Sequence, residues 1–447
     1  MLHVQFNMVT RPKFLLLFVI AFTALGSFLA GRFITESKVI ILKEKANVPQ
    51  PQPSHVATQC MDPYKVPGYL YTPEDYRQSS YVPFDKLYHD YNQPDYAAYP
   101  WTGTASPDLS DPIPENEFLA TSPHSWMLDL VTYNRYFDDS AYGGRPFNKA
   151  RRNELAKSLA WLRGRRILMI ADSVDRYMMA YLCEELGYEA VINKPRHTTA
   201  SCTIPHLNFT IIHWHLASYY TSRPNWWWQD IMEYVPFEER YDKIFKDKLG
   251  ETIGLNGKSP DLIIFQSGLW DQVTFNKKYA SEPEGKYAIN NKKNIMMERQ
   301  STWAELRFYG SRLQAFISHL RNLFGENAHI IHRALTPHKT FNDRDIMVLE
   351  LDRVARSISF FEGVEVMDWA KLTAGFSSEW KDDVHVNKGA LSWLYQNIML
   401  SYLFRAAGGV EYQGEIIRDP IVNASDVPED AWGECHDSLV LQSFENR

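Results

Sequence analysis

Six short apolar runs alternate with helical patterns after residue 150, and this alternation restricts the folds open to the chain. The runs occupy residues 165–172, 188–193, 209–215, 261–268, 328–334 and 363–369. Amphipathic helical patterns cover 152–164, 174–187, 302–324, 344–359 and 387–404. Apolar strands that alternate with helices are typical of a parallel sheet covered on both faces. The sequence therefore predicts an α/β domain over residues 151–407, with polar or aromatic insertions at 216–258 and 272–300.

An uncharged apolar segment, residues 14–31, follows Arg11 and Lys13 near the amino terminus. About 20 apolar residues cross a bilayer, so the segment predicts a transmembrane helix. A cleaved signal peptide is the alternative, because its apolar core is shorter. We expect residues 1–32 to form a cytosolic tail and signal-anchor, and the proline-punctuated residues 33–60 to form an extended stem.

Residues 61–150 are rich in proline, tyrosine and aspartate and show little periodicity, which predicts an irregular, aromatic-rich cover. Tyrosine is concentrated in residues 64–99, which suits either a segment that wraps a core or a glycan-facing surface. Residues 408–447 form a C-terminal extension. The net charge of −7 provides no basic field for nucleic acid, so we expect no nucleic-acid partner.

The chain has four cysteines, and none has a metal-like spacing. Disulfides are therefore expected in an oxidising compartment, and four buried free thiols are the alternative. Proximity in sequence favours Cys183–Cys202, and the second pair, Cys60–Cys435, would tie the two ends together.

Two triplets that begin at Asn208 and Asn423 are glycosylation acceptors. Together with the apolar segment near the amino terminus, they predict a single-pass type II membrane glycoprotein of the secretory pathway, with most of the chain in the Golgi or ER lumen. Cleavage of the segment would instead give a secreted protein.

Segments that contain polar residues follow three of the predicted strands. Ser173 follows the first strand, the segment from Gly268 to Asp271 follows a later one, and His385 lies on a loop after the last. Working groups in such sheets gather beyond the carboxyl ends of the strands, so we expect the three loops to meet on one rim.

A serine becomes a nucleophile when a base, itself oriented by a third group, removes its proton. Ser173 could be that nucleophile, His385 the base and Asp382 the group that holds His385. The alternatives are a helix N-cap for Ser173 and an ordinary surface-loop residue for His385.

In chain order, these motifs resemble the SGNH/GDSL hydrolase superfamily. The match is to its PC-esterase branch, which includes plant trichome-birefringence-like polysaccharide O-acetyltransferases and fungal relatives. "ADSVDR" resembles the G-D-S-x-x-R signature with Arg176 in place, "KDDVHVN" resembles the D-x-x-H block, and "HRALTPH" resembles a preceding segment with Arg and Pro. The similarity spans residues 160–405 and implies a flavodoxin-like three-layer sandwich with a parallel sheet.

The resemblance implies an esterase or acetyltransferase that works through a serine acyl-enzyme and needs no cofactor. The acyl group would pass from Ser173 to water or to a sugar hydroxyl of a glycan or acylated carbohydrate. A transferase would need a membrane partner that delivers acyl groups, because a single anchor offers no route across the bilayer. A lipid or small-ester hydrolase, and a non-catalytic glycan-binding pseudoenzyme, are the alternatives.

Two positions depart from the family pattern. Ala171 replaces a glycine, which is tolerated unless the backbone there requires positive φ. Trp270 replaces the asparagine that donates to the oxyanion. The candidates for the oxyanion or substrate are Trp270 itself, Gly268, Arg176, Asp271 and Arg333. His338 is a further candidate for the cleft, and a strand-end turn is the alternative for Arg333 and His338.

Two further points concern side chains near this rim. A first-turn salt bridge with Asp172 or Asp175 is the alternative for Arg176. His213 and His215 share a strand face but lack a third ligand at useful spacing, so no metal site is expected.

Overall fold

The computed structural model describes residues 64, 68–83, 122–137, 148–193, 198–219, 235–246, 260–281, 299–339, 345–373, 376–407, 410–412 and 415–417. The predicted anchor and stem lie outside these ranges, as do Cys60, Cys435 and Asn423. Within the described ranges, no helix combines the length and apolar character needed to cross a bilayer.

A seven-stranded sheet in the order β4-β5-β6-β3-β7-β8-β9 forms the centre of the fold. The strands are β3 (Arg166–Ala171), β4 (Val191–Ile192), β5 (Thr199–Ile204), β6 (Phe209–His215), β7 (Leu262–Phe265), β8 (Ile330–Arg333) and β9 (Glu365–Met367). Strands β6, β3, β7, β8 and β9 are mutually parallel, which confirms the predicted α/β class. Strands β4 and β5 are antiparallel to their neighbours, so the sheet is mostly rather than wholly parallel.

The antiparallel edge was not predicted, because β5 has the polar sequence TASCTI and shows no apolar run. It joins β6 through a 3-10 turn, η4 (Pro205–Leu207), and then Asn208, whose φ of 50° suits the left-handed turn. The predicted strand at 188–193 is reduced to the two exposed residues of β4.

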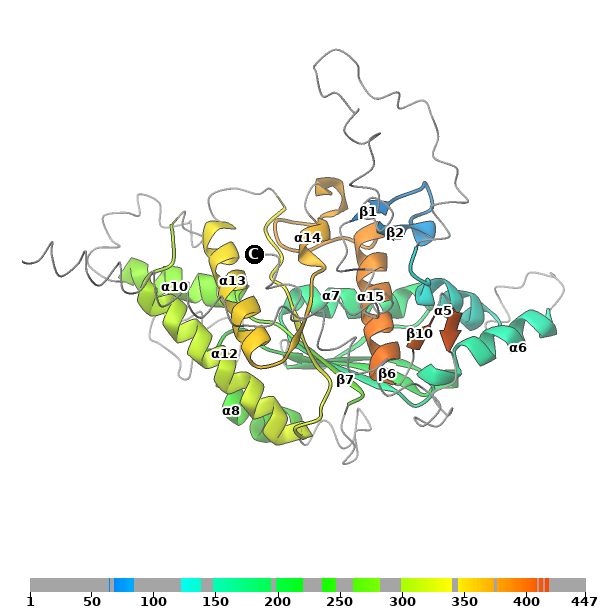
Figure 1. The fold of residues 1–447 in the computed structure, drawn as a ribbon, viewed down its shortest axis with the longest axis horizontal. Helices are drawn as coiled ribbons and strands as arrows, with labels where there is room; N and C mark the ends of the chain where they lie inside the picture. Colours follow the sequence, from blue (N-terminus) through cyan, green and yellow to red (C-terminus); the bar gives the residue numbers. More distant parts are fainter. Residues whose placement is uncertain are drawn as a thin grey trace, which may run out of the picture. The chain divides into compact units, whose positions relative to one another are not determined.

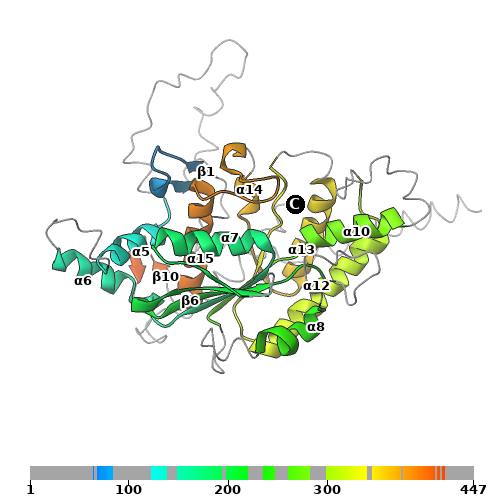
Figure 2. The ribbon, with the colours of Figure 1, turned by 180° about the vertical axis from the view of Figure 1, so that it is seen from behind.

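Helices pack on both sides of this sheet (Figures 1 and 2). The longer ones are α5 (Trp126–Arg135), α6 (Lys149–Ser158), α7 (Ser173–Glu185), α10 (Leu269–Ser281), α12 (Trp303–Phe324), α13 (Asp345–Phe361) and α15 (Ala390–Ala406). The short ones are η3 (Ala160–Leu162), α8 (Phe237–Arg240), η5 (Tyr241–Phe245), α14 (Ala370–Thr373) and η6 (Ser377–Glu379). In both views α5, α7 and α15 lie on one side of the sheet, and α8 and α12 lie on the other. The insertion predicted at 272–300 begins inside helix α10, which extends to Ser281.

The predicted cover contains regular structure that packs on the domain. A hairpin of β1 (Gly68–Tyr71) and β2 (Ser80–Pro83) encloses the 3-10 turn η1 (Tyr76–Gln78). Helix α5 is a core element, since Trp126, Met127 and Leu130 are buried and Asn397 of α15 accepts a hydrogen bond from the Met127 amide at 3.0 Å. In the C-terminal extension, β10 (Val410–Tyr412) and β11 (Glu415–Ile417) form a second hairpin. The irregular-cover prediction is therefore wrong for the hairpin at 68–83 and for α5.

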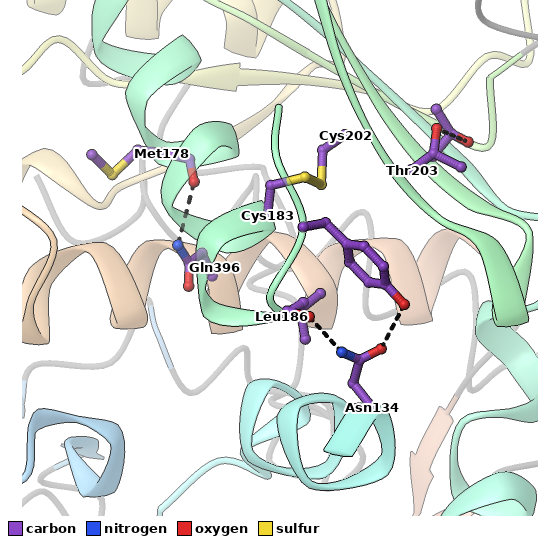
Figure 3. Close-up of a disulfide and its surroundings, with 9 residues drawn as sticks. Asn134, Met178, Cys183, Leu186, Cys202, Thr203 and Gln396 are labelled. Atoms are coloured by element: carbon purple, nitrogen blue, oxygen red, sulfur yellow. Dashed lines mark hydrogen bonds between the residues drawn. A yellow bond between two sulfur atoms is a disulfide. The ribbon is translucent and has the colours of Figure 1, made fainter. Parts of the chain in front are cut away.

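Helix α7 is tied to its surroundings along its length (Figure 3). A disulfide joins Cys183 of α7 to Cys202 of β5, which is the predicted pairing, with the two Cα atoms 5.7 Å apart. The side chain of Gln396 donates to the Met178 carbonyl at 3.3 Å, and Asn134 donates to the Leu186 carbonyl just beyond the helix. The helix that begins at Ser173 is therefore fixed from both of its flanks.

The strand order places the rim at a topological switch point. After β3, the chain forms β4, β5 and β6 on one side of that strand, and then forms β7 on its other side. Ligands in open α/β sheets bind beyond the carboxyl ends of the strands at such a reversal. Ser173 follows β3 and Gly268 follows the adjacent β7, so the fold brings together the two loops that the sequence singled out.

Candidate active site

Ser173 is the first residue of α7, and it does not cap the helix. The cap is Asp172, whose Oδ1 accepts a hydrogen bond from the Val174 amide at 2.9 Å. The Ser173 hydroxyl is thus available for another partner, and its oxygen lies 2.7 Å from Nε2 of His385. The adjacent acidic residue removes the N-cap alternative for this serine.

His385 is oriented by Asp382, three residues earlier on the same loop. Its Nδ1 lies 2.8 and 2.9 Å from the two carboxylate oxygens. Because an ionised carboxylate only accepts, Nδ1 donates and Nε2 is left to accept the Ser173 proton. The pKa of Asp382 is below its usual value: burial alone would raise it, but hydrogen bonds from the Val384 amide and from His385 outweigh that effect.

Buried polar side chains contact Asp172 from the interior of the protein. Nε2 of His213 donates to the Asp172 carbonyl at 2.9 Å, and Gln266 donates to its carboxylate at 3.3 Å. Burial, followed by the nearby charge of Arg176, lowers the pKa of His213 to about 4, so this imidazole is neutral at pH 7. Burial and then Asp175 raise the pKa of Asp172. His213 therefore fixes the strand-to-helix corner that presents Ser173.

Gly268 occupies a position that no other residue fits. Its φ is 154°, and a Cβ added there would lie 2.5 Å from Cδ1 of Leu335. A side chain would therefore be strained by the backbone and would also clash with a buried leucine. The main chain just after β7 therefore carries no side chain at Gly268. Strand β7 is the neighbour of β3, the strand that precedes Ser173.

Two predicted substrate residues, Arg333 and Asp271, instead have buried partners. The guanidinium of Arg333 is fully buried and binds the Asp175 carboxylate through Nε at 2.7 Å and Nη2 at 2.8 Å. Tyr395 donates to the same carboxylate at 2.6 Å. A buried pair with this many hydrogen bonds holds α7 against β8 and α15.

The Asp271 carboxylate, at the start of α10, is also fully buried. It accepts hydrogen bonds from the Ser218 hydroxyl at 2.8 Å, from the Tyr219 amide at 3.0 Å and from the Ser267 hydroxyl. Burial raises its pKa to about 6, and these hydrogen bonds partly oppose the rise. The carboxylate thus ties the segment that follows β6 to the start of α10 inside the protein.

Three further candidate residues take varied positions. Arg176 is buried close to His213, with its guanidinium carbon 5.9 Å from the ring centre of Tyr177. Trp270 is half-buried in the first turn of α10. His338 is buried, and its Nδ1 lies 2.7 Å from Oδ1 of Asp345. The sequence placed all three at the rim by motif alone, and their roles there stay predictions.

Ala171 introduces no backbone strain. It is the last residue of β3, fully buried and paired in register with His215. Among the described non-glycine residues, positive φ occurs at Asn208 alone. The methyl group of Ala171 therefore sits on ordinary strand backbone.

One contact of His385 was not predicted. The ring of Tyr177, one turn after Ser173, packs edge-on against the ring of His385, with centroids 4.8 Å apart. Lys381 places its ammonium 4.5 Å from the centre of the same tyrosine ring. The four-residue spacing of Ser173 and Tyr177 was the available signal, because it puts both on one helix face.

A metal centre finds no support in the described ranges, where no three His, Cys, Asp or Glu side chains are grouped to hold an ion. The Nε2 atom of His213 is already engaged with the Asp172 carbonyl.

No family model and no curated protein matches this chain. Among solved structures, it is similar to an acetylxylan esterase from Geobacillus stearothermophilus, with 14% identity over 55% of this chain and 95% of that one and a TM-score of 0.27. It is also similar to a lipase/acylhydrolase from Enterococcus faecalis, with 11% identity over 55% of this chain and 96% of that one and a TM-score of 0.27. A third similar structure is a GDSL-like lipase from Bacteroides thetaiotaomicron, with 12% identity over 62% of this chain and 98% of that one and a TM-score of 0.26.

Proposed function

We propose that this chain is a serine-dependent acyl esterase or O-acetyltransferase of the SGNH hydrolase superfamily, in its PC-esterase branch. The observation that carries the proposal is the continuous hydrogen-bonded series from Ser173 through His385 to Asp382 at the switch point of the sheet. Such a series is the arrangement that activates a serine hydroxyl. It also argues against a pseudoenzyme, because nothing in a glycan-binding role requires the three groups to be aligned.

In the proposed mechanism, the Ser173 oxygen attacks the carbonyl carbon of an ester while His385 Nε2 takes the hydroxyl proton. The protonated imidazole then gives this proton to the leaving alcohol, which leaves an acyl group on Ser173. Water or a sugar hydroxyl next attacks the acyl-enzyme, with His385 again acting as the base. Asp382 stays ionised throughout, in keeping with its lowered pKa, and stabilises the imidazolium.

The developing oxyanion needs donors in place of the missing family asparagine. We place the Ser173 and Gly268 main-chain amides in that role, with Arg176 and Trp270 beside them. Ser173 begins a helix of 13 residues, and the positive end of the helix dipole favours negative charge there.

The substrate that we propose is an acyl ester of a glycan. Lys381, Asp382 and Asp383 are exposed and charged at the mouth of the site, and Tyr177 is half-buried beside them. A polar rim with an aromatic ring suits a sugar better than a lipid, which would need an apolar entrance.

We further propose a lumenal, secretory-pathway location for the catalytic domain, anchored by residues 14–31. The Cys183–Cys202 disulfide supports an oxidising compartment, and Asn208, an acceptor for glycosylation, is exposed at its turn. A transferase activity would require a membrane partner that supplies acyl groups.

The test is acetyl release from an O-acetylated oligosaccharide by the full-length protein, followed by mass spectrometry. An unacetylated acceptor sugar in the same reaction separates transfer from hydrolysis, because only transfer increases its mass. We expect deacetylation that is lost in Ser173→Ala and retained in the matched control Ser311→Ala, on the exposed surface of α12. Equal turnover by parent and Ser173→Ala would contradict the proposal.

A further inference from the structure

One face of α7 follows the catalytic loop from the histidine onward. Four residues at four-residue intervals contribute: Ser173, Tyr177, Tyr181 and Glu185. Their contacts are the Ser173–His385 hydrogen bond (2.7 Å), the Tyr177–His385 ring contact (4.8 Å), a Tyr181 hydroxyl bond to the Val386 carbonyl (3.3 Å) and a Glu185–Lys388 ion pair (3.1 Å). Residues spaced by four lie on one helix face, so these contacts form one continuous seam.

The two sides of the seam differ in length, and the lysine compensates for the difference. From Ser173 to Glu185 the helix rises about 18 Å. From His385 to Lys388 an extended chain spans at most about 11 Å. The long side chain of Lys388 covers the remainder and reaches the carboxylate. The ion pair therefore holds the far end of the loop along the helix axis.

Glu185 is the most buried charge in this seam and links three separate segments. Its side chain is 2% exposed, against 25% for Lys388. It accepts hydrogen bonds from Arg77 Nε at 2.9 Å and from the Tyr76 hydroxyl, both in η1 of the N-terminal segment. Burial alone would raise the pKa of Glu185, but hydrogen bonds from Tyr76, Arg77 and Lys388 outweigh it and the pKa is lowered. The carboxylate is therefore ionised and fully engaged at neutral pH.

The backbone that carries Glu185 is itself fixed. Cys183, two residues earlier, is in the disulfide to β5, and the Leu186 carbonyl accepts from Asn134 (Figure 3). Movement at this end of the seam is thus left to the loop, not to the helix.

We propose that Glu185 is a positioning residue: through Lys388 it holds the loop that carries His385 in register with Ser173, and the Tyr76–Arg77 turn of the N-terminal segment completes this clamp. The proposal rests on the proposed function for its catalytic consequence, but the clamp itself is a property of the loop. Removing the carboxylate would release Arg77 and leave Lys388 with the exposed Glu184 as its remaining carboxylate partner, so that His385 would spend less time within reach of the serine.

Glu184 provides a matched control. It is the adjacent residue on the same helix and contacts the same Lys388 ammonium, at 3.0 Å, but its side chain is 63% exposed. An exposed pair contributes little, whereas Glu185 is engaged by three donors in a nearly dry environment. Glu185→Gln and Glu184→Gln therefore remove the same charge and a contact to the same lysine from neighbouring positions, but only Glu185→Gln changes the buried pair and the contacts to Tyr76 and Arg77.

The experiment measures two quantities on the full-length protein and both variants. The first is hydrogen exchange of residues 381–388, where the Val384 and His385 amides donate to Asp382, with α12 as an internal reference. The second is the rate of Ser173 labelling by a fluorophosphonate. For Glu185→Gln we expect faster exchange in this loop but not in α12, and labelling slowed about tenfold or more through loss of base orientation. Glu184→Gln should match the parent in both.

The possible outcomes separate the clamp from the chemistry. Unchanged exchange at 381–388 in Glu185→Gln overturns the clamp, whatever the labelling shows. Faster exchange with an unchanged labelling rate overturns the positioning role, and a parent that is never labelled counts against the proposed function while leaving the exchange result to decide the clamp. If Glu185→Gln does not fold, Arg77→Met and Lys388→Met, which remove single donors, take its place with the same expected direction.

Discussion

Ser173 and His385 lie 2.7 Å apart, from Oγ to Nε2, although 212 positions separate them in the chain. Asp172 makes this contact possible, because it caps α7 and leaves the serine hydroxyl uncommitted. A second acid, Asp382, fixes the histidine from its own loop. Asp172 thus caps the helix and Asp382 orients His385. The Ser173 hydroxyl is left to interact with the imidazole.

Replacing the orienting carboxylate tests the role of Asp382. In Asp382→Asn, the amide can present its NH2 group to Nδ1 and favour the wrong imidazole tautomer, so we expect kcat for ester hydrolysis to fall by about 10²–10⁴. The carboxylate is 49% exposed, which places the expectation toward the lower end of that range. Asp242→Asn, the same change at an exposed position on η5, should retain most of the activity. Steady-state kinetics decide this, and equal losses in the two variants would contradict the assignment.

Gly268→Ala tests the close approach at the end of β7. A Cβ there meets Leu335 at 2.5 Å on positive-φ backbone, so we expect a loss of about 2–4 kcal/mol in unfolding free energy, together with loss of activity. Gly187→Ala also has positive φ but no neighbour within 4 Å, and should cost about 1 kcal/mol. Denaturant unfolding measures both. Adding Leu335→Ala should relieve part of the Gly268→Ala effect, and no such relief would remove the clash explanation.

Ala171→Gly introduces the glycine of the G-D-S-x-x-R signature that this segment resembles. Because Ala171 has ordinary strand backbone and is fully buried, the change should bring no gain in kcat. We expect a loss of about 0.5–1 kcal/mol in stability from the added backbone freedom. A clear increase in kcat would show that the methyl group restricts the site.

Acid should destabilise the protein through buried neutral histidines. Burial, then the charges of Arg356 and Arg333, lowers the pKa of His332 to about 3 in the folded state, and neither ring nitrogen has a hydrogen-bond partner. The unfolded chain binds a proton near pH 6.5 while the folded one does not, so the stability from this group is present above that pH and is lost as the pH falls toward 3.

At pH 5 the loss from His332 amounts to about 2 kcal/mol. His332→Leu removes the titrating group and replaces two unsatisfied nitrogens with apolar surface. Urea unfolding at pH 7 and pH 5 should show a smaller difference for the variant than for the parent. Identical differences would mean that other groups set the acid sensitivity.

Long apolar runs and their order along the chain were sufficient to predict the parallel part of the sheet and the rim where Ser173 and His385 meet. Local pattern could not find β5, because its polar residues are held by pairing with β6, nor the core position of α5, which depends on Asn397 far along the chain. Sequence also placed Arg333 at the substrate, since motif position does not reveal that Asp175 is its partner. Tyr177 and Glu185 could have been found, because their spacing from Ser173 is already a helix-face pattern.

The most direct test of the account is covalent labelling of the full-length protein by a fluorophosphonate, with the modified residue located by mass spectrometry. We predict one dominant adduct on Ser173, absent in Ser173→Ala and strongly slowed in His385→Ala, together with hydrolysis of a small acetyl ester by the parent alone. An intact parent that neither forms this adduct nor hydrolyses the ester faster than Ser173→Ala would contradict the account.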